Sequence, residues 1–213
     1  MDKDFWIKKW ENNETGFHLS EVNPILVENF NKLLLPKNSR VFIPLCGKTK
    51  DIGWLLSKGY RVAGAEMSQL AIKELFKELG IEPSISKNIH STLFSAQNID
   101  IFAGDIFEIS SVELGMVNAI YDRAALVALP QNLRLKYTSH LMEITNIAPQ
   151  LLIGIEYNQM LMSGPPFSVN SDEIRAHYSD NYRLDLINKT NIPGGLKGEK
   201  CAASQSVWLL NSI

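Results

Sequence analysis

Cysteine is scarce in this sequence, and the few possible metal ligands are scattered. The chain of 213 residues contains two cysteines, Cys46 and Cys201, and four histidines. No spacing among these residues is typical of a zinc site, and two cysteines this far apart do not indicate a disulfide framework. We therefore expect neither a disulfide nor a bound metal.

Basic runs and long apolar runs are also missing. Lys and Arg number 21 against 23 Asp and Glu, a formal charge of −2, and no window has the concentration of positive charge that a phosphate backbone requires. The amino terminus is charged and has no apolar signal core, and no stretch approaches the ~20 apolar residues of a membrane span. We expect a soluble cytoplasmic protein that binds neither nucleic acid nor membranes.

The Gly-rich fingerprints of dinucleotide and triphosphate sites are absent, but a related pattern is present. Residues 42–48, Phe-Ile-Pro-Leu-Cys-Gly-Lys, predict an apolar strand and a tight Gly turn directly before an amphipathic helix. Glu66 closes the next predicted strand. This arrangement is typical of a ribose-binding α/β unit, so we expect an adenosine-like cofactor held by a non-standard loop.

Strand and helix patterns alternate along the middle of the chain. Apolar runs predict five parallel strands, and a late pair of strands is most simply antiparallel. The seven predicted strands are 40–44, 60–65, 99–103, 117–121, 151–155, 182–188 and 204–210. With 45% hydrophobic residues, the chain is expected to form one α/β domain over residues 1–213. Its fold would be a doubly wound, mostly parallel sheet with helices on both faces, the class I methyltransferase architecture.

Two helices, 5–11 and 20–35, are predicted before the first strand. We interpret residues 1–36 as a helical N-terminal cover over the active site. Trp6, Trp10 and Phe17, together with Met160, Met162 and the run 164–167, provide apolar side chains for a lid over a flat ligand. The alternative is that these aromatic side chains only fasten the helix to the domain.

Polar residues at the predicted strand ends are the candidate ligand contacts, because ligands of open parallel sheets lie beyond the carboxyl ends of the strands. Glu66 is placed to accept hydrogen bonds from both ribose hydroxyls, or else it is an exposed helix-capping acid. Asp105 is a candidate acceptor for an adenine amine, with Ile106 packing on the ring. Alternatively, Gly104-Asp105 is an ordinary turn.

No catalytic residue is assigned. Cys46 precedes a predicted helix, where a thiol is activated, but a small buried residue is the commoner role at a strand end. His18 is more simply a structural hydrogen-bond partner than a general base. Metal ligands are also left unassigned.

Several sequence blocks resemble the thiopurine S-methyltransferase family. They are Trp6 and Trp10 with Gly16-Phe17-His18, then 44–48 with Asp51 and Trp54, 64–68, 104–107, 122–130, Glu156-Tyr157 and 164–167. The resemblance implies a methyltransferase that uses S-adenosyl-L-methionine and alkylates the sulfur of an aromatic or heterocyclic thiol. It places Trp10, Leu45, Glu66 and Arg123 at the cofactor and Phe17 at the substrate, with Asp105 and Ile106 in the adenine-contacting segment. Ala65 and Met67 depart from the family pattern without removing a polar contact.

The implied chemistry fits the predicted pocket. A thiolate and a sulfonium combine into neutral products, so a dry apolar site favours the reaction and no protein base is needed. The fixed charge of Arg123 would favour an anionic substrate. Two alternatives are a methyltransferase for inorganic selenium or tellurium species and a non-catalytic adenosine-compound sensor. A nicotinamide oxidoreductase ranks last. We expect a monomer with a small-molecule thiol substrate.

Overall fold

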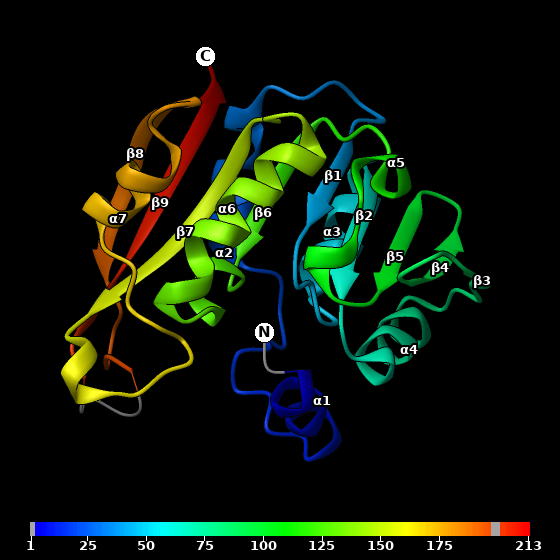
Figure 1. Ribbon diagram of the computed structural model, residues 1–213, viewed down its shortest axis with the longest axis horizontal. Helices are drawn as coiled ribbons and strands as arrows, with labels where there is room; N and C mark the ends of the chain where they lie inside the picture. The colour runs from blue at the N-terminus through cyan, green and yellow to red at the C-terminus, as the bar shows by residue number, and fades with distance from the viewer. Residues whose placement is uncertain (1–2, 197–200) are drawn as a thin grey trace. The chain divides into compact units, whose positions relative to one another are not determined.

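The computed structural model describes residues 3–196 and 201–213 (Figure 1). The chain divides into two compact units, Met1–Ala119 and Ile120–Ile213. The glycine-rich run 194–198 predicts a solvated hairpin loop, and part of this run lies outside the described residues. No helix in the described part of the chain is long and apolar enough to cross a membrane.

The first unit contains five strands in the order β3-β4-β5-β2-β1. Strands β5, β2 and β1 are parallel, and the β3-β4 hairpin joins the sheet antiparallel to β5. Their bounds are β1 (Arg40–Ile43), β2 (Arg61–Glu66), β3 (Ser84–Lys87), β4 (Thr92–Ala96) and β5 (Ile99–Ala103). All four residues of β1 are buried, as expected for a central strand of a parallel sheet.

The helices of the first unit begin and end at the expected residue types. Ser68 and Gly80 are the residue types that predict the start and the end of a helix between them, and both predictions are confirmed. Ser68 caps α4 by accepting a hydrogen bond from the Ala71 N–H at 3.2 Å, and Gly80 ends the helix at φ 67°. The bounds are α1 (Lys3–Glu11), α2 (Pro24–Asn29), η1 (Phe30–Leu33), α3 (Lys50–Ser57), α4 (Gln69–Leu79), η2 (Ile106–Glu108) and α5 (Ser111–Leu114).

The helix predicted at 20–35 is shorter than expected. Pro24 occupies the first turn of α2, and Asn23 caps it through the Ile25 N–H at 2.9 Å. Proline lacks the N–H that a helix interior needs, so the helix begins there rather than at residue 20. The helix then continues as the tighter turn η1, which ends at the cap residue Leu34 with φ 52°.

The second unit contains four strands in the order β6-β7-β9-β8. β6 and β7 are parallel, whereas β9 is antiparallel to both β7 and β8, as predicted for the late pair. The bounds are β6 (Ala119–Arg123), β7 (Gln150–Tyr157), β8 (Tyr182–Asn191), β9 (Ala203–Ser212), η3 (Leu126–Ala128), α6 (Gln131–Thr145), η4 (Gln159–Leu161) and α7 (Ser171–Tyr178).

The strand count of seven was wrong, because the described residues form nine strands. The two missed strands are the β3-β4 hairpin. Every residue of β3 is exposed. The strand therefore lacks the alternation of buried and exposed residues by which a strand is predicted from sequence.

Candidate functional site

The parallel ladder of the first unit brings three predicted segments to one edge of the sheet. Ile43 pairs with Gly64, and Glu66 pairs with Ala103. The loop after β1, Glu66 at the end of β2 and Asp105 after β5 therefore all follow the carboxyl ends of neighbouring strands. We call the loop 44–48 together with Glu66 the cradle.

Glu66 is only 6% exposed, and its carboxylate is held by backbone N–H groups. Oε2 accepts from the Gly47 N–H at 2.8 Å, and Oε1 accepts from the Ser68 N–H at 2.7 Å. Each oxygen keeps acceptor capacity for a further donor. The alternative of an exposed capping acid was wrong, because Glu66 is buried and Ser68 provides the cap.

Burial raises the pKa of Glu66, and the hydrogen bonds from Ser68 and Gly47 partly oppose that rise. Backbone N–H groups orient the carboxylate, and within residues 3–196 and 201–213 no Lys or Arg forms an ion pair with it. An oriented buried acceptor of this kind suits neutral hydroxyl donors, such as those of a ribose.

The cradle loop turns sharply because two of its residues adopt left-handed backbone angles. Leu45 has φ 47° and Gly47 has φ 54°. The Cys46 N–H donates to the Ala65 carbonyl at 2.9 Å, which ties the loop to β2. A methyl group added at Gly47 would lie 2.8 Å from Cζ2 of Trp10, so only glycine allows both the turn and the contact with the indole ring.

Ion pairs hold the cradle loop to α4. Lys48 pairs with Glu74 at 2.8 Å and with Glu78 at 3.0 Å, and Lys50 reaches Glu78 at 2.6 Å. The hydrogen bond to Glu74 is the main reason that the pKa of Lys48 is raised. Lys48 therefore holds the cradle loop against α4, which is consistent with the absence of a phosphate-loop pattern in the sequence.

The N-terminal segment is fastened to the same region. Trp10 is buried, and its ring meets Phe17 edge-on with centroids 5.4 Å apart. Phe17 also meets Trp6 edge-on at 5.6 Å. Further along, the Asn23 N–H donates to Asp51 Oδ1 on α3 at 2.8 Å. The aromatic side chains therefore do fasten this segment, and Trp10 does so directly against the cradle loop.

Asp105 is partly buried and begins a short helix. Its Oδ1 accepts from the Phe107 N–H at 3.1 Å, which makes it the N-cap of η2. Ile106 is fully buried. The preceding Gly104 donates its N–H to the Glu66 carbonyl at 3.0 Å. Asp105 thus has the turn role of the simpler interpretation, and its contact with adenine stays a prediction.

In the second unit, Arg123 ends β6 and follows a buried carboxylate. Asp122 is fully buried, and it accepts from the Leu126 N–H at 3.2 Å and from the Tyr137 hydroxyl at 2.7 Å. Burial raises the pKa of Asp122 to about 6. These bonds fix the turn after Arg123, in which Ala124 has φ 63°. The sequence did not reveal the pairing, because Tyr137 shares the helical spacing of Leu141 and Ile144 and so has the pattern of an ordinary core residue of α6.

Arg134 holds the Gly-Pro-Pro-Phe loop of the second unit, a role that the sequence alone did not reveal. Its guanidinium donates to the Ser168 carbonyl at 3.1 Å and to Glu173 at 2.7 Å, and it lies over the Phe167 ring at 5.9 Å. The Tyr157 hydroxyl donates to the Pro166 carbonyl at 2.7 Å. The apolar run is therefore held by a buried polar network.

Neither candidate nucleophile nor candidate base gains support. Cys46 is buried, and burial, followed by the charge of Glu66, raises the pKa of its thiol well above the usual range. A thiolate is therefore disfavoured at this position. His18 lies beside Trp10 with ring centroids 6.4 Å apart. No catalytic residue is assigned at this site.

Comparison with known proteins identifies the family. Residues 1–208 match the family described as thiopurine S-methyltransferase (TPMT). The chain belongs to the thiopurine S-methyltransferase family. It is 49% identical to the thiopurine S-methyltransferase of Xanthobacter autotrophicus over 211 residues, which is 99% of both chains. It is 48% identical to that of Teredinibacter turnerae, over 99% of this chain and 98% of the relative.

Solved structures show the fold. A methyltransferase from Burkholderia thailandensis, described as acting on N1 of 1,6-didemethyltoxoflavin, superposes with a TM-score of 0.68 at 10% identity, covering 99% of this chain and 87% of that one. A SAM-dependent methyltransferase from Anabaena variabilis gives 0.66 at 16% identity, covering 99% and 95%.

Membership in the thiopurine S-methyltransferase family confirms the predicted fold class, the enzyme class and the cofactor, S-adenosyl-L-methionine. It also confirms the general function, a methyltransferase of the thiopurine S-methyltransferase type acting on a small molecule. The residue assignments are separate from this result, and they stay predictions.

Proposed function

We propose that this protein transfers the methyl group of S-adenosyl-L-methionine to the sulfur of small aromatic or heterocyclic thiols. The observation that carries the proposal is the Glu66 carboxylate, which is buried at the end of β2 and oriented by the Gly47 and Ser68 N–H groups. Such an acceptor fits the two hydroxyls of a ribose. When bound, the cofactor supplies an electrophilic methyl group on a sulfonium.

The proposed cofactor contacts are Trp10, Leu45, Glu66, Asp105 and Arg123, and the proposed substrate contact is Phe17. In the first unit, support comes from the position of Leu45 in the cradle loop and from the packing of Trp10 on Gly47. Phe17 touches Trp10. Arg123 is proposed from its motif, and the bonds of Asp122 give its turn a defined conformation.

The protein's own contribution is positioning and exclusion of water. The combination of a thiolate with a sulfonium removes charge, so apolar side chains such as Trp10 and Phe17 favour the reaction by keeping water away. Acidic thiols ionise near neutral pH without help. This is consistent with the described part of the site, which contains a buried carboxylate and aromatic rings and to which no base–nucleophile pair is assigned.

We also propose that residues 1–36 act as the cover of a single methyltransferase domain that is a monomer. The contacts of Trp10 with Gly47 and of Asn23 with Asp51 support the cover. A cytoplasmic location is proposed as well, and the free thiols of Cys46 and Cys201 are consistent with a reducing compartment.

An assay with labelled S-adenosyl-L-methionine and a panel of acceptors tests the function. The panel contains aromatic thiols, aliphatic thiols, selenite and tellurite, with headspace analysis for volatile products. We expect transfer to the aromatic thiols to be fastest. Preferred formation of volatile selenium or tellurium products would contradict the proposed acceptor, and cofactor binding without any transfer would point to a sensor.

A further inference from the structure

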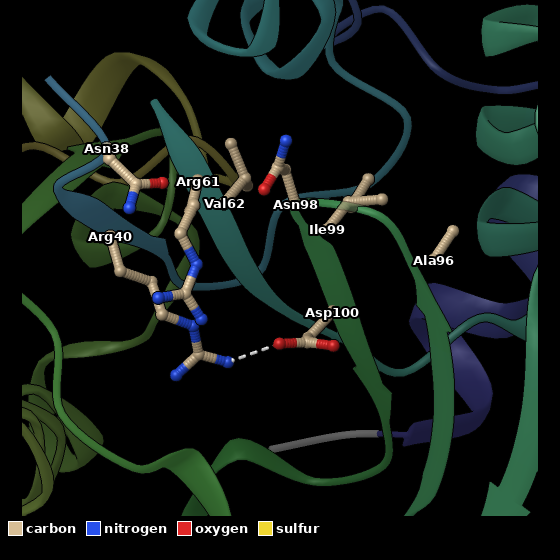
Figure 2. A pocket seen from close by; sticks show the side chains of 8 residues that line it. All are labelled: Asn38, Arg40, Arg61, Val62, Ala96, Asn98, Ile99 and Asp100. Carbon is tan, nitrogen blue, oxygen red and sulfur yellow. Dashed lines mark hydrogen bonds and ion pairs between the residues drawn. The ribbon is translucent and has the colours of Figure 1, made fainter. Parts of the chain in front are cut away.

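A polar cavity of about 380 Å³ lies in the first unit, at the amino ends of β1, β2 and β5 (Figure 2). This is the edge of the sheet opposite the cradle, because the three strands are parallel and the cradle follows their carboxyl ends. The polar side chains that line it are Asn38, Arg40, Arg61, Asn98 and Asp100.

The strand register places three charged side chains on one face of the sheet. Arg40 on β1 is the direct partner of Arg61 on β2. Asp100 on β5 is the partner of Ala63, which lies two residues after Arg61 and so faces the same side. With neighbouring strands about 4.8 Å apart, the two arginines are held side by side, and like charges in directly paired positions are unfavourable.

Asp100, the one carboxylate among these three side chains, already has partners. Asp100 Oδ2 forms an ion pair with Arg40 at 2.7 Å, and its Oδ1 accepts from the Ser95 hydroxyl at 2.6 Å. Arg40 is 8% exposed, and it also donates to the Leu114 carbonyl. Arg40 on β1 therefore reaches across β2 to pair with the carboxylate on β5.

Arg61 is left with an uncompensated charge. Its side chain is exposed on the middle strand, and within residues 3–196 and 201–213 no hydrogen bond or ion pair of its guanidinium is found. In Figure 2 its guanidinium points into the cavity, toward the same region as that of Arg40. With Arg40 and Asp100 neutralising each other, the cavity has a net charge of about +1.

We propose that this cavity binds a small oxyanion, of which inorganic phosphate is the simplest. The planar fork of Arg61 matches two oxygens of a tetrahedral oxyanion, and the side-chain amides of Asn38 and Asn98 are further donors at the rim. The bound anion relieves the repulsion between the two arginines. The site is independent of the cofactor cradle, because it lies at the other edge of the sheet.

A phosphate titration followed by amide NMR at constant ionic strength tests the proposal. We expect shifts concentrated at residues 38–40, 61–62 and 98–100, competition by sulfate, and no such shifts with chloride. Arg61→Gln should weaken phosphate binding about tenfold or more, and Arg61→Lys should weaken it less, because it keeps the charge but not the fork. Arg183→Gln, which removes an exposed arginine at the start of β8, is the matched control and should leave affinity unchanged.

Three outcomes would overturn the proposal. They are equal phosphate affinity in wild type and Arg61→Gln, the absence of localised shifts at millimolar phosphate, and shifts confined to the cradle around Gly47 and Glu66. Because Arg61 is exposed, its replacement should not prevent folding. Unchanged binding of S-adenosyl-L-methionine by Arg61→Gln would verify that the variant is intact.

Discussion

At the scale of single residues, Glu66 is the most informative side chain. It is buried, yet its two oxygens are oriented by backbone N–H groups rather than by a cation. Glu66→Ala should weaken S-adenosyl-L-methionine binding by roughly 1.5–3 kcal/mol, the usual range for hydrogen bonds to a charged group. Titration calorimetry measures this change, with Glu82→Ala, an exposed acid beyond α4, as the control. Unchanged affinity in Glu66→Ala would remove Glu66 from the site.

Asp122 should make stability depend on pH. Its folded-state pKa of about 6 lies above the ordinary value of 3.8, so the native state keeps a proton that the unfolded chain releases. Stability should therefore fall as pH rises from about 4 to about 6, and the loss should then stay constant, amounting to about 2–3 kcal/mol. Urea unfolding of wild type and Asp122→Asn across this range checks the slope. The same slope in both proteins would contradict the assignment.

The residue scale also shows what the sequence can and cannot predict. Glu66 was predictable because an acid at the end of the second strand is a local pattern. Its donors, Gly47 and Ser68, were not, because they act through backbone N–H groups whose directions depend on the folded loop. The Asp122–Tyr137 bond was hidden because a tyrosine on an apolar helix face is indistinguishable from an ordinary core residue until its hydroxyl is placed.

At the scale of elements, the contact between the cradle loop and α1 can be tested at one glycine. Gly47→Ala forces a methyl group toward Trp10 at 2.8 Å and a left-handed backbone on alanine, so it should destabilise the protein by about 1–3 kcal/mol and weaken cofactor binding. Gly80→Ala is the matched control, since Gly80 has φ 67° but open space around it. It should lose about 1 kcal/mol of stability and no cofactor affinity.

Both variants would be compared by thermal unfolding and by calorimetric titration with S-adenosyl-L-methionine. If Gly47→Ala behaved like Gly80→Ala in both measurements, the contact with Trp10 would have no part in holding the cradle. A loss of cofactor affinity in both variants would show that the weaker binding comes from general destabilisation and not from the contact with Trp10.

The elements themselves differ in how well their sequences predict them. The limits of α4 were predictable because Ser68 and Gly80 are strong local signals. The helix predicted at 20–35 is too long because Pro24 starts the helix there, and β3 leaves no signal in the sequence because it has no buried face. Arg134 was missed because its partners at Ser168 and Glu173 are distant in sequence.

At the scale of the whole molecule, the proposal of a single domain has a direct consequence. The chain consists of two compact units that meet in sequence at residues 119–120. If they form one cooperative domain, urea unfolding followed by fluorescence and by circular dichroism should give one coincident transition. Two transitions, or disagreement between the probes, would show that the units are independent domains.

The account as a whole depends on the place where the cofactor binds. The most direct measurement is a crystal structure of the protein with S-adenosylhomocysteine, the demethylated product of the cofactor. We predict that both ribose hydroxyls donate to Glu66, with Leu45 and Trp10 in contact with the ligand. A ligand bound away from the end of β2, or a ribose that does not touch Glu66, would contradict the account.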